Sequence, residues 1–283
     1  MFAGIRGIGV GGGIGRPLRA GCKSCPFPAC LPGATRNWAW RGSQPIPAAS
    51  WYRPIVLRLF QYFAINAGRP LPKEKILDDL WPDTDPAKAW ATFRTVYSRL
   101  RKLIEPYMRP KAANRYISLN SDTYTFDPDG QAYIDVVQFQ QIVGHALHNR
   151  DTRAVSTIPK PLVETLQSYA PLLPDLPYAE WLLEPRQRVQ ELYVEGCLFL
   201  AQAYLVQGEN GTAVTWARQT ITAAPWLEEA YQLLMRGYAR QGQRTLALHV
   251  YNEAAANLKR ELNLEPSPLT QQLADSLRTG KSI

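Results

Sequence analysis

The sequence predicts a mainly α protein, in which a winged helix-turn-helix domain is followed by an all-α, tetratricopeptide-like helical domain. Between residues 39 and 128, three stretches of helical periodicity precede a change to a period of two, which is the order of a winged helix. Residues 133 to 278 read as helix throughout and contain a repeat spaced by 34 residues. Residues 1 to 38 are rich in Gly, Pro, Cys and Ala and lack periodicity, so we expect a poorly ordered tail.

Turn and capping residues mark the elements of the first domain. Gly68 ends the first helix, Pro72 opens the second, and Asp83–Pro86 is a turn and N-cap signal for the third. The three helices are expected at residues 51 to 67, 73 to 80 and 86 to about 104. A hairpin is then expected from strands at residues 115 to 119 and 123 to 126, joined by a turn at residues 120 to 122.

Positive charge is concentrated in this domain. The net charge is +8, and residues 36 to 116 hold 15 lysines and arginines against 6 acids, which leaves the rest of the chain close to neutral. A basic segment beside a neutral one is typical of a nucleic-acid binder with a separate partner domain. The alternative is that the excess of basic residues only keeps the surface soluble.

The third helix carries cations and hydroxyls opposite its apolar stripe, and this face holds no acid before Glu105. An α-helix fits the major groove of B-DNA, where arginine bonds guanine bidentately and Thr and Ser reach base edges or phosphates. We therefore predict that it binds double-stranded promoter DNA, although a solvated helix face would show the same charges. The predicted contact residues are Lys88, Thr92, Thr95, Ser98, Arg99 and Lys102, with Arg94 and Arg101 at the flanks and Arg115 on the basic tip of the hairpin.

Two motifs in the tail match known sites only in part. Cys22, Cys25 and Cys30 could begin a zinc site, but the fourth ligand is missing locally, so we predict no metal. Gly7-x-Gly9-x-x-Gly12 has neither a preceding strand nor an acid about 20 residues later, as a dinucleotide site requires. Without a nucleophile–base arrangement or a phosphate loop, we expect neither catalysis nor a cofactor. No apolar run reaches the roughly 20 residues of a membrane span, so we expect a cytoplasmic protein without membrane contact.

The 34-residue spacing in the second half is that of the tetratricopeptide helix-turn-helix repeat. Glycine falls at the turn between two helices, and a small alanine falls where they pack. Such arrays present a groove to a protein partner, or they simply complete a fold. The paired identities are Glu195 with Glu229, Leu200 with Leu234, Tyr204 with Tyr238, Gln207 with Gln241, Gly208 with Gly242, and Ala213 with Ala247. We expect the paired tyrosines and alanines to lie in the core.

Residues 45 to 278 resemble the bacterial transcriptional activator family typified by the Streptomyces antibiotic regulatory proteins. The matching motifs are Leu59–Phe63, Gly68–Leu71, Leu80–Pro82, Ser98–Arg101, Tyr133–Val136 with Phe139, Leu172–Glu180, Leu234–Tyr238 and Glu261–Pro268. The resemblance implies a winged helix that recognises direct repeats in promoter DNA. It also implies a helical domain, over residues 133 to 278, that dimerises or contacts RNA polymerase. The alternative is a tetratricopeptide interaction scaffold with a degenerate winged helix.

The start of the chain departs from the family, whose members open with a small β-sheet. Only Trp38–Arg41 and Gln44–Pro47 resemble such a hairpin, and residues 1 to 37 do not fit. One hypothesis is a misassigned start or a frameshift upstream of about Trp38, which would leave a Gly-rich translation where native strands belong.

Overall fold

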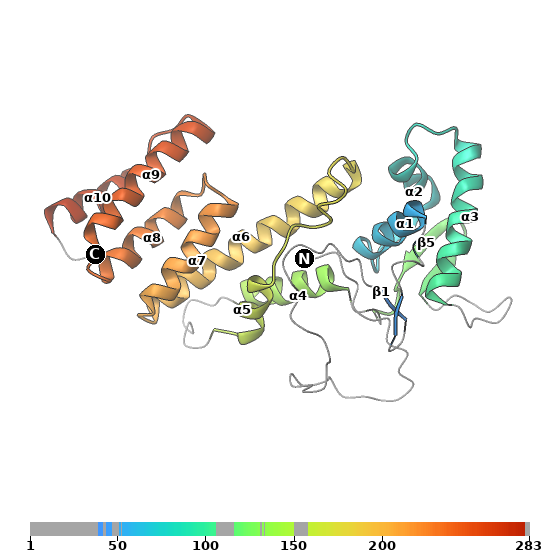
Figure 1. Ribbon diagram of the computed structural model, residues 1–283, viewed down its shortest axis with the longest axis horizontal. Helices are drawn as coiled ribbons and strands as arrows, with labels where there is room; N and C mark the ends of the chain where they lie inside the picture. Colours follow the sequence, from blue (N-terminus) through green and yellow to red (C-terminus); the bar gives the residue numbers. More distant parts are fainter. Residues whose placement is uncertain are drawn as a thin grey trace. The chain divides into compact units, whose positions relative to one another are not determined.

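The computed structural model describes residues 39–41, 44–46, 51, 53–105, 116–130, 132, 134–149 and 158–280 (Figure 1). They fall into two compact units. The first unit contains the chain up to Gln138 together with Ala170–Pro185, and the second contains Phe139–Tyr169 and the chain from Arg186 onward. The predicted mainly α class is confirmed. The tail expected at residues 1 to 38 lies outside the described residues.

Three helices form the body of the first unit: α1 (Pro54–Ile65), α2 (Lys73–Leu80) and α3 (Pro86–Ile104). The second and third have the predicted bounds. The first begins later than predicted, because Pro54 occupies its first turn, where the missing proline N–H costs nothing. Asp85 caps α3, since its carboxylate accepts hydrogen bonds from the N–H groups of Ala87 and Lys88 at 3.1 and 3.2 Å.

Two small antiparallel sheets accompany these helices. Strands β1 (Ala39–Arg41) and β2 (Gln44–Ile46) pair with each other, which confirms the hairpin suspected at the start of the matching region. The predicted hairpin after α3 consists of β4 (Ile117–Asn120) and β5 (Thr123–Phe126). A further strand, β3 (Pro70–Pro72), pairs with β5 to give the order β3-β5-β4. Sequence reasoning missed β3 because two of its three residues are prolines, which only an edge strand tolerates.

Aromatic rings fill the space between α1, α3 and the hairpin. Phe63 and Phe93 are fully buried, and their rings lie 6.3 and 5.1 Å from that of Tyr124 on β5. Phe126, also fully buried, stacks on Phe63 at 6.3 Å. These contacts hold the hairpin against both helices and fix which face of α3 is left for solvent.

The expectation that residues 133 to 278 are helical throughout is wrong for one stretch. Helices α4 (Asp135–His148) and α5 (Lys160–Gln167) are followed by non-helical chain, up to the 3₁₀ helix η2 (Glu180–Leu182). Three prolines within ten residues, at positions 171, 174 and 177, interrupt the backbone hydrogen bonding that a helix needs. We call Ala170–Pro185 the strap, because it belongs to the first unit although α5 belongs to the second.

The second unit ends in a helical array (Figure 1) made of α6 (Leu183–Val206), α7 (Asn210–Ala223), α8 (Glu228–Arg240), α9 (Arg244–Leu262) and α10 (Pro268–Thr279). The first three residues of α6 still belong to the strap. The two predicted turns are alike: Gly208 and Gly242 have φ angles of 81° and 75°, which favour glycine. Ala213 and Ala247 are buried, as predicted. The prediction that Tyr204 and Tyr238 are core is wrong, since both are only half-buried.

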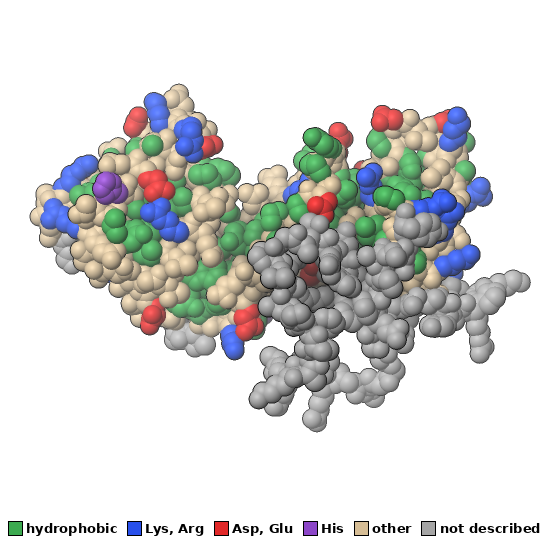
Figure 2. Space-filling view, in the orientation of Figure 1, with side chains coloured by type: hydrophobic (Ala, Val, Ile, Leu, Met, Phe, Trp, Pro, Cys, Tyr) green, Lys and Arg blue, Asp and Glu red, His purple; other side chains and the backbone are tan. Residues whose placement is uncertain are grey.

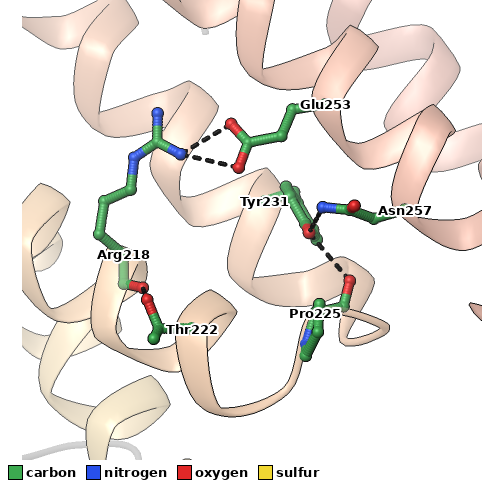
Figure 3. A network of polar contacts seen from close by, with 6 residues as sticks. All are labelled: Arg218, Thr222, Pro225, Tyr231, Glu253 and Asn257. Carbon is green, nitrogen blue, oxygen red and sulfur yellow. Dashed lines mark hydrogen bonds and ion pairs between the residues drawn. The ribbon is translucent and has the colours of Figure 1, made fainter.

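Polar contacts tie neighbouring helices of this array together (Figure 3). Arg218 of α7 reaches both carboxylate oxygens of Glu253 of α9, at 3.0 and 2.7 Å. The Tyr231 hydroxyl donates to the Pro225 carbonyl at 2.9 Å and accepts from the Asn257 amide at 2.6 Å. The Asn257–Tyr231 bond joins residues 26 apart in the sequence, and the Arg218–Glu253 bond joins residues 35 apart. Both therefore fix the register of one repeat on the next.

Candidate nucleic-acid interface

The outward face of α3 gathers most of the predicted DNA-contacting residues. At about 100° per residue, Lys88, Thr92, Thr95, Arg99 and Lys102 form one stripe along the helix. All except Arg99 are exposed, and Arg99 is half-buried. Ser98 is exposed beside this stripe. Figure 2 shows lysine and arginine side chains along the length of α3.

The opposite face of α3 explains why this stripe points outward. Phe93 and Leu100 are fully buried there, and Val96 nearly so, because this side of α3 packs against α1 and the Phe93 ring also meets Tyr124 of the hairpin. The helix cannot rotate without exposing them. The amino-acid pattern therefore sets the direction of the basic face by burying the other one.

Arg94 and Arg101 lie on a flank of α3, roughly 90° or more from the stripe. Each guanidinium lies over the ring four residues earlier, with Arg94 5.8 Å from the Trp90 ring centre and Arg101 5.9 Å from that of Tyr97. Lys73, at the start of α2, also lies over Trp90, at 5.1 Å. These aromatic contacts restrain the cations beside the face.

Sequence reasoning missed Trp90 and Lys73 as neighbours of the candidate interface. The aromatic–arginine spacing of four residues was visible on α3, since side chains at that spacing meet on a helix. Lys73 comes from another element, and no local signal placed it against Trp90.

The tip of the hairpin differs from the expectation of a basic tip. The turn between β4 and β5 consists of Ser121 and Asp122, and Ser121 has a φ of 54°. The tip is tied to α2, because the Asp122 carboxylate lies 3.3 Å from the Lys73 ammonium and its carbonyl accepts from the Lys73 N–H at 2.8 Å. Hydrogen bonding to Asp122 raises the pKa of Lys73. Arg115 precedes β4 and lies outside the described residues.

Within the described part of the chain, no group of three or more His, Cys, Asp or Glu side chains is arranged to hold a metal ion. Cys22, Cys25 and Cys30 lie outside that part. Cys197 on α6 is fully buried, and burial raises the pKa of its thiol to about 12. Among the described helices, none combines the length and the apolar character needed to cross a membrane.

Comparison with known proteins gives one family and several relatives. Residues 134–278 match the model of the bacterial transcriptional activator domain. The chain is 26% identical over 246 residues to the regulatory protein AfsR of Streptomyces griseus, an alignment covering 83% of this chain and 23% of AfsR. It is 28% identical to the transcriptional regulator RedD of Streptomyces coelicolor, over 77% of this chain and 62% of RedD. The chain thus spans less than a quarter of AfsR.

A solved structure shares the fold. Mycobacterium tuberculosis EmbR, determined in complex with a low-affinity phosphopeptide, superposes with a TM-score of 0.67 at 21% identity. The superposition covers 85% of this chain and 62% of EmbR. At this identity the likeness establishes the fold that the two chains share.

Proposed function

Since the chain belongs to the family of regulators that carry the bacterial transcriptional activator domain, we propose that it is a sequence-specific DNA-binding transcriptional activator that reads promoter DNA with α3. The family resemblance predicted from the motifs is confirmed by the match to that domain and by the AfsR and RedD relatives. RedD is a transcriptional regulator by name and AfsR is a regulatory protein by name, which favours a regulator over an interaction scaffold.

The observation that carries the proposal is the outward stripe of α3. Lys88, Arg99 and Lys102 project from a helix of 19 residues whose other face is locked into the core. No acid interrupts the stripe from Lys88 to Lys102. Cations at this spacing neutralise phosphates on both sides of the major groove, and an arginine among them can bond guanine bidentately.

The flank of α3 has a different role in this proposal. Arg94 and Arg101 are restrained by Trp90 and Tyr97 on the flank of α3, roughly 90° or more from the stripe. A cation at the edge of a groove-bound helix meets the sugar-phosphate backbone before it meets bases. We therefore assign phosphate contacts to Arg94 and Arg101, and base contact to Arg99. Arg115 keeps its expected role as a phosphate or minor-groove contact near the hairpin.

The helical repeats supply the partner surface in this proposal. Arrays of this kind present side chains of successive helices to another protein. The partner is RNA polymerase or a second copy of this chain. Two copies bound to direct repeats would raise each other's effective concentration on the DNA.

The test measures binding of the full chain to a duplex selected by that chain from a random pool. Arg99→Ala should weaken binding by about 1–3 kcal/mol and relax the preference at one base pair. Arg94→Ala and Arg101→Ala should weaken binding to all sequences alike, each lowering the salt slope by about 1. Lys160→Ala, on the exposed surface of α5, is the matched control and should leave both quantities unchanged.

Two results would count against the proposal. Failure of the full chain to enrich any duplex would favour the scaffold with a degenerate winged helix. A second contrary result would be that Arg99→Ala, Arg94→Ala and Arg101→Ala all bind the selected duplex as tightly as the parent chain. Another surface would then recognise the DNA.

A further inference from the structure

The middle of the α3 stripe is built from short side chains between long ones. Thr92 and Thr95 lie between Lys88 and Arg99, which are about 16 Å apart along the helix axis at 1.5 Å per residue. Ala91 is exposed beside the two threonines. The long side chains of Lys88 and Arg99 reach a base or a phosphate at a distance, while the short residues let the helix backbone approach the floor of the groove. The groups that these three residues present to the groove therefore decide which bases the middle of the helix recognises.

Both threonine hydroxyls are already committed as donors. The Thr92 hydroxyl donates to the Lys88 carbonyl at 2.9 Å, and the Thr95 hydroxyl donates to the Ala91 carbonyl at 3.2 Å. A hydroxyl has one hydrogen, so neither donates to an acceptor on a base edge while it keeps this bond. What remains for the groove is the γ-methyl group of each threonine, the β-methyl of Ala91, and the lone pairs of the hydroxyl oxygens.

Methyl groups distinguish one base from the others. In the major groove only thymine presents a methyl group, at C5, and contact with Ala or Thr methyls is the apolar way to recognise it. Building on the proposed function of α3, we infer that Thr92 and Thr95, with Ala91 beside them, are specificity-determining residues that recognise the C5 methyl groups of thymine. The operator then carries thymines at its centre, between the bases or phosphates bound by Lys88 and Arg99.

The experiment removes one of the two contacting methyl groups at a time, either the C5 methyl from the base or the γ-methyl from the threonine. The probe is the duplex selected by the full chain, prepared with thymine or with uracil, which differs from thymine only in lacking the C5 methyl. Thr95→Ser and Thr92→Ser remove the protein methyl and keep the hydroxyl. Thr95→Val and Thr92→Val keep a methyl and remove the hydroxyl. Thr215→Ser is the matched control, because Thr215 is an exposed helical threonine in the second unit with the same bond to the carbonyl four residues back.

The expected result is a coupling between the two deletions. Uracil should weaken binding of the parent chain about fourfold for each methyl contacted, following the transfer free energy of one buried carbon. Thr95→Ser or Thr92→Ser should weaken binding to the thymine duplex by a similar factor and reduce the further loss caused by uracil. The valine variants should bind the thymine duplex like the parent. Thr215→Ser should show the full uracil effect, which separates coupling from any general change in DNA shape.

Two outcomes would overturn the inference. One is equal affinity of the parent chain for the thymine and uracil duplexes. The other is loss of binding in the valine variants with retention in the serine variants, because the hydroxyl oxygen would then be reading an amino group of adenine or cytosine. Arg99→Ala on the same probes separates this failure from that of the proposed function: if it still weakens binding, α3 remains the reader.

Discussion

Two helical glycines of the second unit have opposite surroundings. A Cβ added to Gly237 on α8 would lie 2.8 Å from the Cγ2 of Val214 on α7, whereas one added to Gly144 on α4 would meet nothing within 4 Å. Valine has a stiff, branched side chain that yields little. Glycine at position 237 therefore lets α7 and α8 approach each other closely, and glycine at position 144 has no such role.

The two glycine-to-alanine variants should consequently change the free energy of unfolding in opposite directions. Gly144→Ala should stabilise the second unit by up to about 1 kcal/mol, the helix-propensity gain. Gly237→Ala should destabilise it, because overpacking typically costs about 1–3 kcal/mol and exceeds that gain. Urea unfolding of the full chain, followed by circular dichroism, measures both changes. Equal stabilisation by the two variants would mean that Val214 moves aside at no cost.

The repeat predicted burial correctly at positions where only a small side chain fits, and incorrectly at positions that hold a large one. Ala213 and Ala247 were predicted at equivalent packing positions and are buried, because only a small side chain fits where two helices approach closely. Tyr204 and Tyr238 share the same spacing but remain half-buried. A repeat period shows that positions are equivalent, but it does not show how deep they lie.

At the scale of elements, local signals located α2 and α3 to the residue. Asp85 and Pro86 mark the start of α3 whatever lies around it, since capping depends only on neighbouring backbone groups. The strap and β3 depend instead on partners distant in sequence. The Trp181 ring lies 5.2 Å from that of Tyr62, whose hydroxyl donates to Asp79 at 2.6 Å. No local sequence pattern predicts that residues after α5 pack on α1.

The strap should stabilise the winged helix against which it packs. Trp181→Ala removes the ring that lies edge-on to Tyr62, and we expect a loss of about 1 to 2 kcal/mol in the free energy of unfolding of the first unit. Tyr178→Ala is the control, because Tyr178 is a strap aromatic that is 94% exposed. Urea denaturation of the full chain measures both. Coincident unfolding curves for the two variants would show that the contact of Trp181 with Tyr62 contributes nothing to the stability of the first unit.

Over the whole molecule, charge and packing are divided between two parts of the sequence. Residues 36 to 116 hold 15 of the 32 lysines and arginines, while the helical repeats are close to neutral. The division of charge is visible in the composition alone. The composition could not predict that the strap, which lies within the domain expected at residues 133 to 278, would belong to the unit that carries α3.

This division predicts that activation and DNA binding can be separated in the full chain. Ala213 is 2% exposed on α7, so Ala213→Trp should wedge the first repeat apart at a cost of about 1–3 kcal/mol. The variant should still select its operator through α3 but should no longer stimulate transcription by purified RNA polymerase. Thr215→Trp adds the same side chain to the exposed surface of the same helix, so it should keep the repeat folded and the operator bound.

The affinity of Ala213→Trp for DNA distinguishes the two proposed partners of the repeats. If the repeats join two copies of the chain, affinity for a paired site should fall toward that for a single site, because tethered readers lose their effective concentration. If the repeats contact RNA polymerase, affinity should be unchanged while stimulation is lost. Gel retardation on single and paired sites, run beside in vitro transcription, measures both. Full stimulation by Ala213→Trp, with its repeat shown to be disrupted by circular dichroism, would remove the activation role from these helices.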